Sequence, residues 1–459
     1  MILDRRLDLK NKLKRAIFML SLVFLVTGCA SVPKTQPQVD AYSASAQYEN
    51  ALKILNSGPK SYGKNNELLY LLDKAIIEHF AGHYSESIET FSRAQQIFDQ
   101  LYTESISKIA ATWVINDYAA PYHGEDFESV FINIFQSLNY LKISKSQEAL
   151  VEARDVDSKL GAINNQYADD QKNVYKEDAF ARLLMGIIYE MENTREGIND
   201  AFISYQKALQ TYENDYEPNY GVGVPKILKE NILTAARDMG FSEFGNYKEK
   251  FNDIQLRTID EKRNKGELYL IQYNGVCPEK IEESVPIPTF DGYMIKMAFP
   301  KYRNRPYAVS YSRIHAYDAK GALISENTEL VQDIGKIATE NLKRRRLRFI
   351  AKSAARATSK YLIAKKQEES IKKKNNNVMA GWFNFFANLY NIVSEQADLR
   401  SWQTLPDQIR MARLLLPPGE YTLVLEHFNS SGENLGQLNL PAIKISAGEK
   451  QFIVTHTTR

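Results

Sequence analysis

The sequence has few of the residues that build covalent cross-links, metal sites and catalytic triads. Its 459 residues include two cysteines, Cys29 and Cys277, and six histidines. It contains no G-x-S-x-G nucleophile motif, no complete phosphate-binding glycine loop and no C-x-x-C pair. These absences argue against the common classes of serine hydrolase, nucleotide hydrolase and thiol oxidoreductase. We therefore expect a protein that is not an enzyme and that binds no cofactor or metal.

Charge of one sign and long apolar runs are also lacking. Lys and Arg number 58 against 56 Asp and Glu, for a formal net charge of +2, so no strong basic field favours nucleic acid as a partner. The most apolar stretch, Ala16–Thr27, has 12 residues, whereas a transmembrane helix needs about 20. Hydrophobic residues make up 44 % of the chain, which is ordinary for a globular protein. The length predicts about two or three domains.

The order of features at the N-terminus is that of a secretory signal. Residues 1–15 carry six Lys and Arg against two Asp, and the apolar stretch ends in the small residues "VTGC" (26–29). These residues resemble the lipobox of bacterial lipoproteins, in which the cysteine thiol carries diacylglycerol, the chain is cut before the cysteine, and the new amine is usually acylated too. The resemblance implies a signal peptide at 1–28 and a lipid anchor on Cys29. The alternative is an uncleaved signal anchor with an incidental cysteine.

The residue after the cysteine bears on location. Inner-membrane lipoproteins often carry Asp at that position, and this chain has Ala30, so the resemblance implies a protein anchored in the outer membrane and facing the periplasm. Residues 29–40 contain two prolines and no apolar period, and we expect them to be a flexible lipidated tether. Cys277 would then have no partner within the chain, which favours a buried and inert thiol.

From residue 41 to 262 the apolar spacing is helical. Three stretches carry mostly small side chains at offsets of 0, 4 and 7, with a large one between them in two cases: Ser87, Phe91 and Ala94; Ala149, Ala153 and Val156; Ala201, Tyr205 and Ala208. Each follows another predicted helix, at Glu67–Phe80, Phe127–Leu141 and Lys176–Met191. This pattern resembles the tetratricopeptide repeat, a helix–turn–helix unit, although the ladders start 62 and 52 residues apart. An irregular helical bundle is the alternative. The resemblance implies a solenoid that binds other proteins.

In tetratricopeptide arrays the first helix of each unit lines a concave groove. When the repeat is mapped onto this chain, the resemblance implies that the groove is lined by twelve residues: Leu69, Leu72, Ile76, His79, Phe131, Ile134, Leu138, Leu141, Phe180, Leu183, Ile187 and Glu190. Ten of these twelve are large and apolar, and a monomer rarely leaves so large an apolar patch in water. Either a partner peptide or the chain itself must cover them. We favour the chain, with 42–57 and 379–396 as the expected plugs.

At Gly266 the pattern changes to short alternating strands with Gly and Pro turns. Strands are expected within 266–275, 293–302, 307–318 and 417–436, and a hairpin is expected at 442–457. We predict a β-sandwich-like domain in two parts, 266–326 and 409–459. Overall, the fold class is α+β and multidomain, with an N-terminal tetratricopeptide-like helical domain and a C-terminal β-sandwich-like domain interrupted by a helical hairpin.

The interruption, 327–408, is basic in its first arm and aromatic in its second, 381–396. In the first arm Arg344, Arg348, Lys352, Arg356 and Lys360 recur every four residues, so they share one face of a helix. We predict that this stripe faces solvent and contacts anionic lipid, peptidoglycan carboxylates or an acidic protein. The alternative is that these charges pair with acidic helices of the same chain.

Two further clusters are candidate sites. The loop "NDYAAPYHGEDFES" (116–129) could place Asp117, Tyr122, Glu125 and Asp126 around a ligand or cation, or Asp126 could simply cap the helix predicted from Phe127. His79 and His83 are four residues apart, as in some metal sites. Because a helix–turn junction is predicted between them, their rings need not share a face.

The whole chain after the lipobox resembles a family of bacterial lipoproteins with degenerate tetratricopeptide repeats and a C-terminal β-region. The stretches that carry the resemblance are "YHGEDFES", "NGVCPEKIEESVPIP" (274–288), "MAFPKY" (297–302) and "ADLRSWQTLP" (397–406). The lipobox, the helical repeats and the lack of catalytic motifs together favour a non-enzymatic, protein-binding envelope scaffold whose partners are the membrane, through its lipid, and envelope proteins. One alternative is a regulator of a peptidoglycan synthase, because such lipoproteins are often encoded beside activators of penicillin-binding proteins. A cryptic envelope hydrolase is another.

Replacing Cys29 with Ala tests the anchor. We expect a soluble or unprocessed periplasmic protein, because the thiol that accepts the lipid is gone and each buried methylene contributes about 0.8 kcal/mol to membrane binding. Membrane fractionation and gel mobility measure the outcome. A Cys29→Ala variant of normal size that fractionates normally with the outer membrane would contradict the lipobox interpretation.

Overall fold

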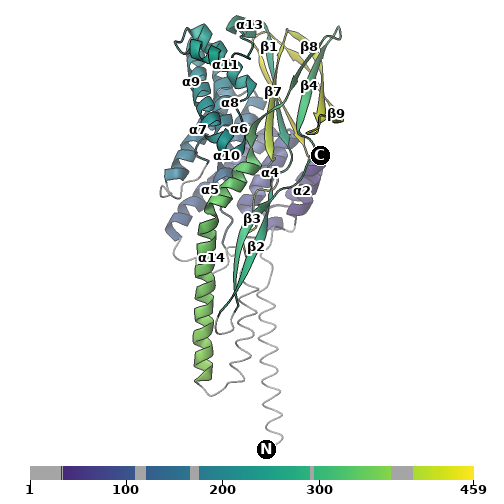
Figure 1. Ribbon diagram of the computed structural model, residues 1–459. Helices are drawn as coiled ribbons and strands as arrows, with labels where there is room; N and C mark the ends of the chain where they lie inside the picture. The colour runs from purple at the N-terminus through teal and green to yellow at the C-terminus, as the bar shows by residue number, and fades with distance from the viewer. Residues whose placement is uncertain are drawn as a thin grey trace, which may run out of the picture.

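The computed structural model describes residues 33, 35–108, 120–165, 175–289, 294–373 and 396–458. Helices fill the first half of the chain and strands dominate the second, as Figure 1 shows. The predicted α+β class, with an N-terminal helical region followed by C-terminal sheets, is therefore confirmed.

The helical region consists of paired helices that stack in chain order. The three pairs that match the predicted repeats are α4 (Glu67–Ala81) with α5 (Tyr84–Lys108), α6 (Asp126–Lys142) with α7 (Ser146–Asn165), and α8 (Ala179–Met191) with α9 (Arg195–Thr211). Each helix contacts the next, and α11 (Lys226–Met239) continues the stack on α9. The other α-helices described in this region are α2 (Gln36–Ala44), α3 (Tyr48–Leu55), α10 (Glu217–Tyr220), α12 (Phe244–Lys250) and α13 (Ile259–Asn264), with a 3-10 turn at Pro59–Tyr62 and a π-helical turn at Tyr212–Tyr216.

The predicted ladders lie where these helices meet. All nine ladder side chains are buried, and the small ones allow the helices to approach closely. Gly186 on α8 gives the clearest case, because a Cβ atom there would lie 2.2 Å from the ring of Tyr205 on α9. The helix pair therefore depends on having glycine opposite a large aromatic ring.

Within the described residues, the strands form two four-stranded sheets and one two-stranded ribbon. The central sheet has the order β10-β1-β7-β6, the outer sheet has the order β5-β4-β8-β9, and β2 pairs with β3. The strands are β1 (Gly266–Asn274), β2 (Glu279–Pro288), β3 (Met294–Arg303), β4 (Tyr311–Asp318), β5 (Leu323–Asn327), β6 (Glu329–Asp333), β7 (Gln408–Leu416), β8 (Gly419–Phe428), β9 (Asn434–Ile445) and β10 (Lys450–Thr457). Strand β1 is parallel to β10 and antiparallel to β7.

The central sheet is covered on both faces. Because side chains alternate along a strand, β1 contributes residues to both contacts. Tyr269, Ile271 and Tyr273 of β1 join the apolar core of the helical region. Leu268 and Leu270 point the other way and pack against β4 and β8 of the outer sheet. The protein therefore has three layers: the helices, the central sheet and the outer sheet, in that order. The two sheets correspond to the predicted β-sandwich.

This arrangement covers the predicted groove. Eleven of its twelve residues are buried, and the side chain of the twelfth, Glu190, is 9 % exposed. The cover is the central sheet: Tyr273 of β1 lies against His79, Phe80 and Phe135. The expectation that the chain plugs its own groove is thus met by a different segment. Helix α3 instead lies beside α4, with Tyr48 against Phe80, and 379–395 is outside the described residues.

Three details of the sequence-based organisation differ. The hairpin predicted at 442–457 is wrong, because β9 belongs to the outer sheet and β10 crosses to the central sheet to pair with β1. Strand β6 lies inside the predicted insertion 327–408, so the long helix α14 begins only at Ile334 and ends at Lys372. Residues 36–40 form the start of α2, with Val39 buried, and are not a flexible tether.

Substituting Gly186 with Ala tests the close helix contact. We expect a loss of about 1–3 kcal/mol in the free energy of unfolding, because the added methyl group must displace the buried ring of Tyr205. The matched control is Gly161→Ala on the exposed side of α7, where a Cβ atom meets nothing within 4 Å. The control is expected to be neutral or slightly stabilising. Urea unfolding midpoints measure both, and equal midpoints would contradict the contact.

Candidate functional site at the helix–sheet interface

Four stretches that are far apart in sequence meet at one place beneath the helical pairs. The segment 396–407, which contains "ADLRSWQTLP", runs across α4 and α6 before it enters β7. Its Trp402 is 1 % exposed, and its ring lies 5.9 Å from that of Phe91 and 6.1 Å from that of Phe135. The loop before α6, the start of β2 and the end of β3 meet the same segment. We call this place the junction.

An ion cluster joins the junction's segments. Lys280 of β2 contacts the Glu125 carboxylate and donates to the backbone oxygen of Arg400, 3.0 Å away. Arg345 of α14 pairs with Glu125 at 3.0 Å and also contacts Asp126. Burial alone would raise the pKa of Glu125, but the charges of Lys280 and Arg345 lower it to about 2. The cluster therefore ties the helical region to both the ribbon and α14.

These contacts show which partners the polar groups of the predicted loop site have. Tyr122, Glu125 and Asp126 have partners within the same chain: the hydroxyl of Tyr122 donates to Glu128, and the carboxylates of Glu125 and Asp126 pair with Arg345. Asp117 lies outside the described residues. The predicted cap is one residue off: α6 begins at Asp126 and Glu125 is the N-cap residue. The reason is a capping box, since Glu128 three residues later accepts the backbone N–H of Glu125 at 2.9 Å.

Glu128 also connects the helical region to residues 396–407, which cross α4 and α6 and which we call the crossing segment. Its carboxyl group accepts the hydroxyl of Tyr122 at 2.6 Å and the backbone N–H of Trp402 at 2.7 Å. Burial, reinforced by the nearby negative charge of Glu125, raises the pKa of Glu128 to about 7. In the sequence Glu128 belongs to the acidic loop 116–129, and nothing in that loop indicates that its carboxyl group is buried.

Asp73 of α4 is a second buried acid at the junction. It accepts the hydroxyls of Tyr62 at 2.8 Å and Thr404 at 2.6 Å, and the side-chain amide of Gln36 at 3.2 Å. Burial raises the pKa of Asp73 to about 7 despite these hydrogen bonds. Through Gln36, this acid holds the N-terminal helix α2 against the crossing segment.

Arg400 lies at the centre of the crossing segment and is 2 % exposed. Its guanidinium pairs with Asp398 at 2.6 Å, donates to the side chain of Asn66 at 3.1 Å and lies 5.5 Å from the ring centre of Tyr122. Sequence reasoning missed this residue, because an isolated Arg in a polar segment reads as a surface residue.

Cys277 lies beside the junction in the turn that precedes β2. Its thiol is buried, and burial raises its pKa well above the ordinary value. Its backbone N–H donates to Leu405 at 2.8 Å, and Arg305 donates to its backbone oxygen at 2.7 Å. The expected buried thiol is therefore found, and the backbone around it connects the ribbon to the crossing segment.

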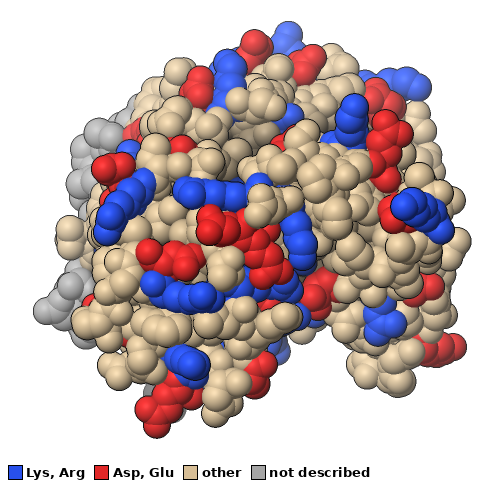
Figure 2. Space-filling model, turned by 90° about the horizontal axis from the view of Figure 1, so that it is seen from above, with Lys and Arg blue, Asp and Glu red and all other residues tan. Residues whose placement is uncertain are grey.

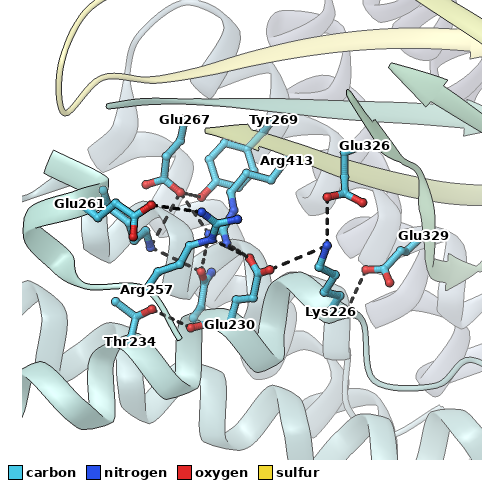
Figure 3. A network of polar contacts seen from close by, with 12 residues as sticks. Lys226, Glu230, Thr234, Arg257, Glu261, Glu267, Tyr269, Glu326, Glu329 and Arg413 are labelled. Carbon is cyan, nitrogen blue, oxygen red and sulfur yellow. Dashed lines mark hydrogen bonds and ion pairs between the residues drawn. The ribbon is translucent and has the colours of Figure 1, made fainter. Parts of the chain in front are cut away.

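A second polar cluster, shown in part in Figure 3, joins the upper helices to the central sheet. Three acids and three bases alternate in it: Glu190, Glu230, Glu267, Lys262, Arg413 and Lys450. Arg413 of β7 contacts Glu230 of α11 and lies 3.1 Å from Glu267 of β1. Glu190 of α8 pairs with Lys262 at 2.6 Å and Lys450 at 3.0 Å. Burial would raise the pKa of Glu267, but Lys262, Lys450 and Arg413 hold it well below its ordinary range.

The two histidines considered for metal binding do different things. His79 is buried, and its two ring nitrogens lie 2.5 Å from the side-chain oxygen of Asn139 and 2.8 Å from the hydroxyl of Tyr273. Burial lowers the pKa of His79 to about 4. His83 instead lies partly exposed beside Glu49, 3.3 Å away. Within the described residues no group of three His, Cys, Asp or Glu could hold a metal ion.

The predicted basic stripe lies along α14. Arg344 is exposed, and the side chains of Arg348, Lys352, Arg356 and Lys360 lie outside the described part of the structure. Its neighbours Arg345 and Arg346 pair with Glu125 and Glu283. The face seen from the α13 end shows basic and acidic residues intermingled (Figure 2). No helix among the described residues is both long and apolar enough to cross a bilayer.

Compared with known families and with curated proteins, the chain matches none of them. Among solved structures, one described as MamA MSR-1 C2, a tetratricopeptide-like protein, is similar over 48 % of this chain and 92 % of that chain. The two share 14 % identity with a TM-score of 0.27. The stacked helix pairs, rather than this similarity, are the basis for describing the helical region as tetratricopeptide-like.

Asp73→Asn tests the buried acid. Because the pKa of Asp73 is raised, the folded state binds a proton that the unfolded chain releases, and this contribution to stability is lost as pH rises from about 4 to about 7. An amide needs no proton and can keep the same partners, since the hydroxyl of Thr404 can accept instead of donate. The stability of Asp73→Asn relative to wild type should therefore rise by about 1 kcal/mol per pH unit between about pH 5 and 7.

Urea unfolding at several pH values measures this difference. The control is Asp253→Asn, at an exposed position, which changes the charge without changing the interface. A relative stability of Asp73→Asn that is independent of pH would show that Asp73 is not protonated in the folded protein.

Arg413→Met tests the second polar cluster. The variant removes the closest cation of buried Glu230 and one of the three cations around buried Glu267, so we expect a loss of about 3–5 kcal/mol in the free energy of unfolding. Arg303→Met removes an ion pair at an exposed site, in which two guanidinium nitrogens contact one oxygen of Glu279, and should cost less than about 1 kcal/mol. Thermal unfolding compares them, and equal effects would contradict the role assigned to burial.

Proposed function

We propose that this chain is a non-enzymatic, protein-binding scaffold of the cell envelope, held to the outer membrane by a lipid on Cys29 and facing the periplasm. The proposal is supported by the stacked helix pairs, since solenoids of this kind present extended binding surfaces. It is also supported by Asp73, Glu128 and His79, three buried titratable groups whose polar atoms bind partners within the chain.

The observation that carries the proposal is the covered groove. Because the central sheet fills the concave side, a protein partner has the outer helices and the outer sheet left to bind. Val151 on α7 and Ile203 on α9 are exposed large apolar side chains. Each lies two residues after the first residue of its ladder, Ala149 or Ala201, so they occupy equivalent positions on neighbouring outer helices. We assign the partner surface to this face.

Site-specific photo-crosslinking in cells tests the assignment. A photoreactive residue at Val151 or Ile203 should form adducts with an envelope protein, and one at exposed Leu323 of the outer sheet is the control. The double variant Val151→Asp/Ile203→Asp should recover the same partner several-fold less well, because apolar contacts at the centre of an interface dominate its energy. Adducts that form equally at all three positions, or at none, would contradict this assignment.

The identity of the adduct separates the scaffold from the alternatives. A peptidoglycan synthase would favour the regulator, and other envelope proteins would favour the general scaffold. Turnover of peptidoglycan fragments by the purified protein would favour the hydrolase and contradict the non-enzymatic assignment.

A further inference from the structure

The outer sheet ends in a long strand, β9, whose outer edge carries few of the usual protections. The strand has twelve residues, pairs with β8 on one side and lies at the margin of the molecule (Figure 1). An edge strand presents unpaired backbone N–H and C=O groups, and proteins usually protect such edges with charges, prolines, bulges or covering elements. Between Asn434 and Ile443, β9 has no charged side chain.

Both edges of the ribbon are protected. The ribbon β2–β3 and the helix α14 project together from the body (Figure 1). The helix covers β3, and the Oγ atom of Ser353 accepts the backbone N–H of Ala298 at 3.1 Å. The other edge, β2, carries charged residues and prolines: Glu282, Glu283, Pro286 and Pro288.

The edges of the central sheet are covered by the helical region. Lys142 of α6 donates to the backbone oxygen of Phe452 on β10 at 2.7 Å. Tyr212 donates to the backbone oxygen of Val331 on β6 at 2.9 Å. The remaining edge, β5 of the outer sheet, is only five residues long. Among the described strands, β9 is therefore the long edge that no other element covers.

Two irregularities limit the part of β9 that could pair further. The pairing with β8 shifts between Asn434 and Gly436 and again between Leu440 and Ile443, and Pro441 lies in the second shift. Regular pairing runs over Gly436–Leu440, five residues without a charge. We call these five residues the free edge.

The free edge is complementary to itself. Two copies that meet antiparallel about a two-fold axis at Leu438 place Leu438 opposite Leu438, Gln437 opposite Asn439, and Gly436 opposite Leu440. The 43 % exposed side chain of Leu438 gains an apolar neighbour, the amides of Gln437 and Asn439 can hydrogen-bond, and no like charges meet. These matches favour a second copy of this chain over an unrelated strand.

We propose that two copies of the chain pair through the free edges of β9, so that their four-stranded outer sheets join into one sheet of eight strands. The contact lies on the outer sheet, whereas Val151 and Ile203 lie in the helical layer, so pairing leaves the proposed partner surface open. Five paired residues make a small contact, because stable interfaces bury at least about 1,200 Å². The pairing is therefore transient and depends on protein concentration.

Disulfide trapping tests the pairing, because oxidation captures a transient contact. Residues directly opposite in an antiparallel pair have Cα atoms about 4.5–5.5 Å apart, within the range of a disulfide. The full-length Leu438→Cys variant, treated in intact cells with a membrane-permeable oxidant, should give a band of twice the monomer mass on a non-reducing gel. Leu323→Cys, 50 % exposed on β5, is the matched control, and the wild type with its two native cysteines gives the baseline.

We expect several-fold more dimer from Leu438→Cys than from Leu323→Cys. Gln437→Cys and Asn439→Cys should each give little dimer alone, because each lies diagonally from its own copy at about 7–8 Å, beyond the usual disulfide range. The two variants expressed together should give dimer, because these positions are opposite each other.

Equal amounts of dimer at positions 438 and 323, or at 438 and at 437 alone, would overturn the pairing. A mixed disulfide between Leu438→Cys and a different protein, formed in place of the dimer, would also overturn it and would assign the free edge to that protein.

Discussion

The central sheet has to be buried on two faces at once, and the rest of the structure depends on this requirement. Along β1, alternate residues supply the core of the sandwich and the cover of the helical groove. A shift of one residue in its pairing with β7 or β10 would exchange the two sets and place Glu267 in the apolar core against the outer sheet. The register is thus fixed by two different partners, which no single β-sandwich or solenoid would require.

The polar clusters show how that register is made specific. A purely apolar sheet could slide over an apolar groove at little cost. Here Glu267, Arg413 and Lys450 sit on three adjacent strands and meet Glu190, Glu230 and Lys262 from three helices, so the charges balance in one alignment. At the other end, His79 meets Tyr273 and Glu128 meets Trp402. Buried charges without partners are costly, so these contacts select one docking geometry over its neighbours.

Sequence reasoning found what depends on local spacing. The helical ladders and several strands follow from periods of 3.6 and 2 within a dozen residues. The parallel pairing of β1 with β10 did not follow, because it joins residues more than 180 positions apart and leaves no local mark. The same holds for the junction: "ADLRSWQTLP" stood out as a resemblance, yet nothing in it announces that Trp402 and Arg400 are among the most buried side chains. The loop 116–129 stood out by its composition, but the partners of Glu125, Lys280 and Arg345, come from a distant strand and a distant helix.

The base of α14 explains why the projecting elements share an orientation with the body. The helix follows β6 without a loop, Asp333 caps it by accepting from Lys336 at 2.8 Å, and Ile334 donates to the backbone of Asp407 at 2.8 Å. Gly335 has no room for a Cβ atom, which would lie 1.9 Å from the side chain of Asp407. Farther along, Arg345 is held by Glu125 and Asp126. The helix is therefore fixed at two points, one in the central sheet and one in the helical region. The contacts at these two points set the direction of α14 relative to the stacked helices.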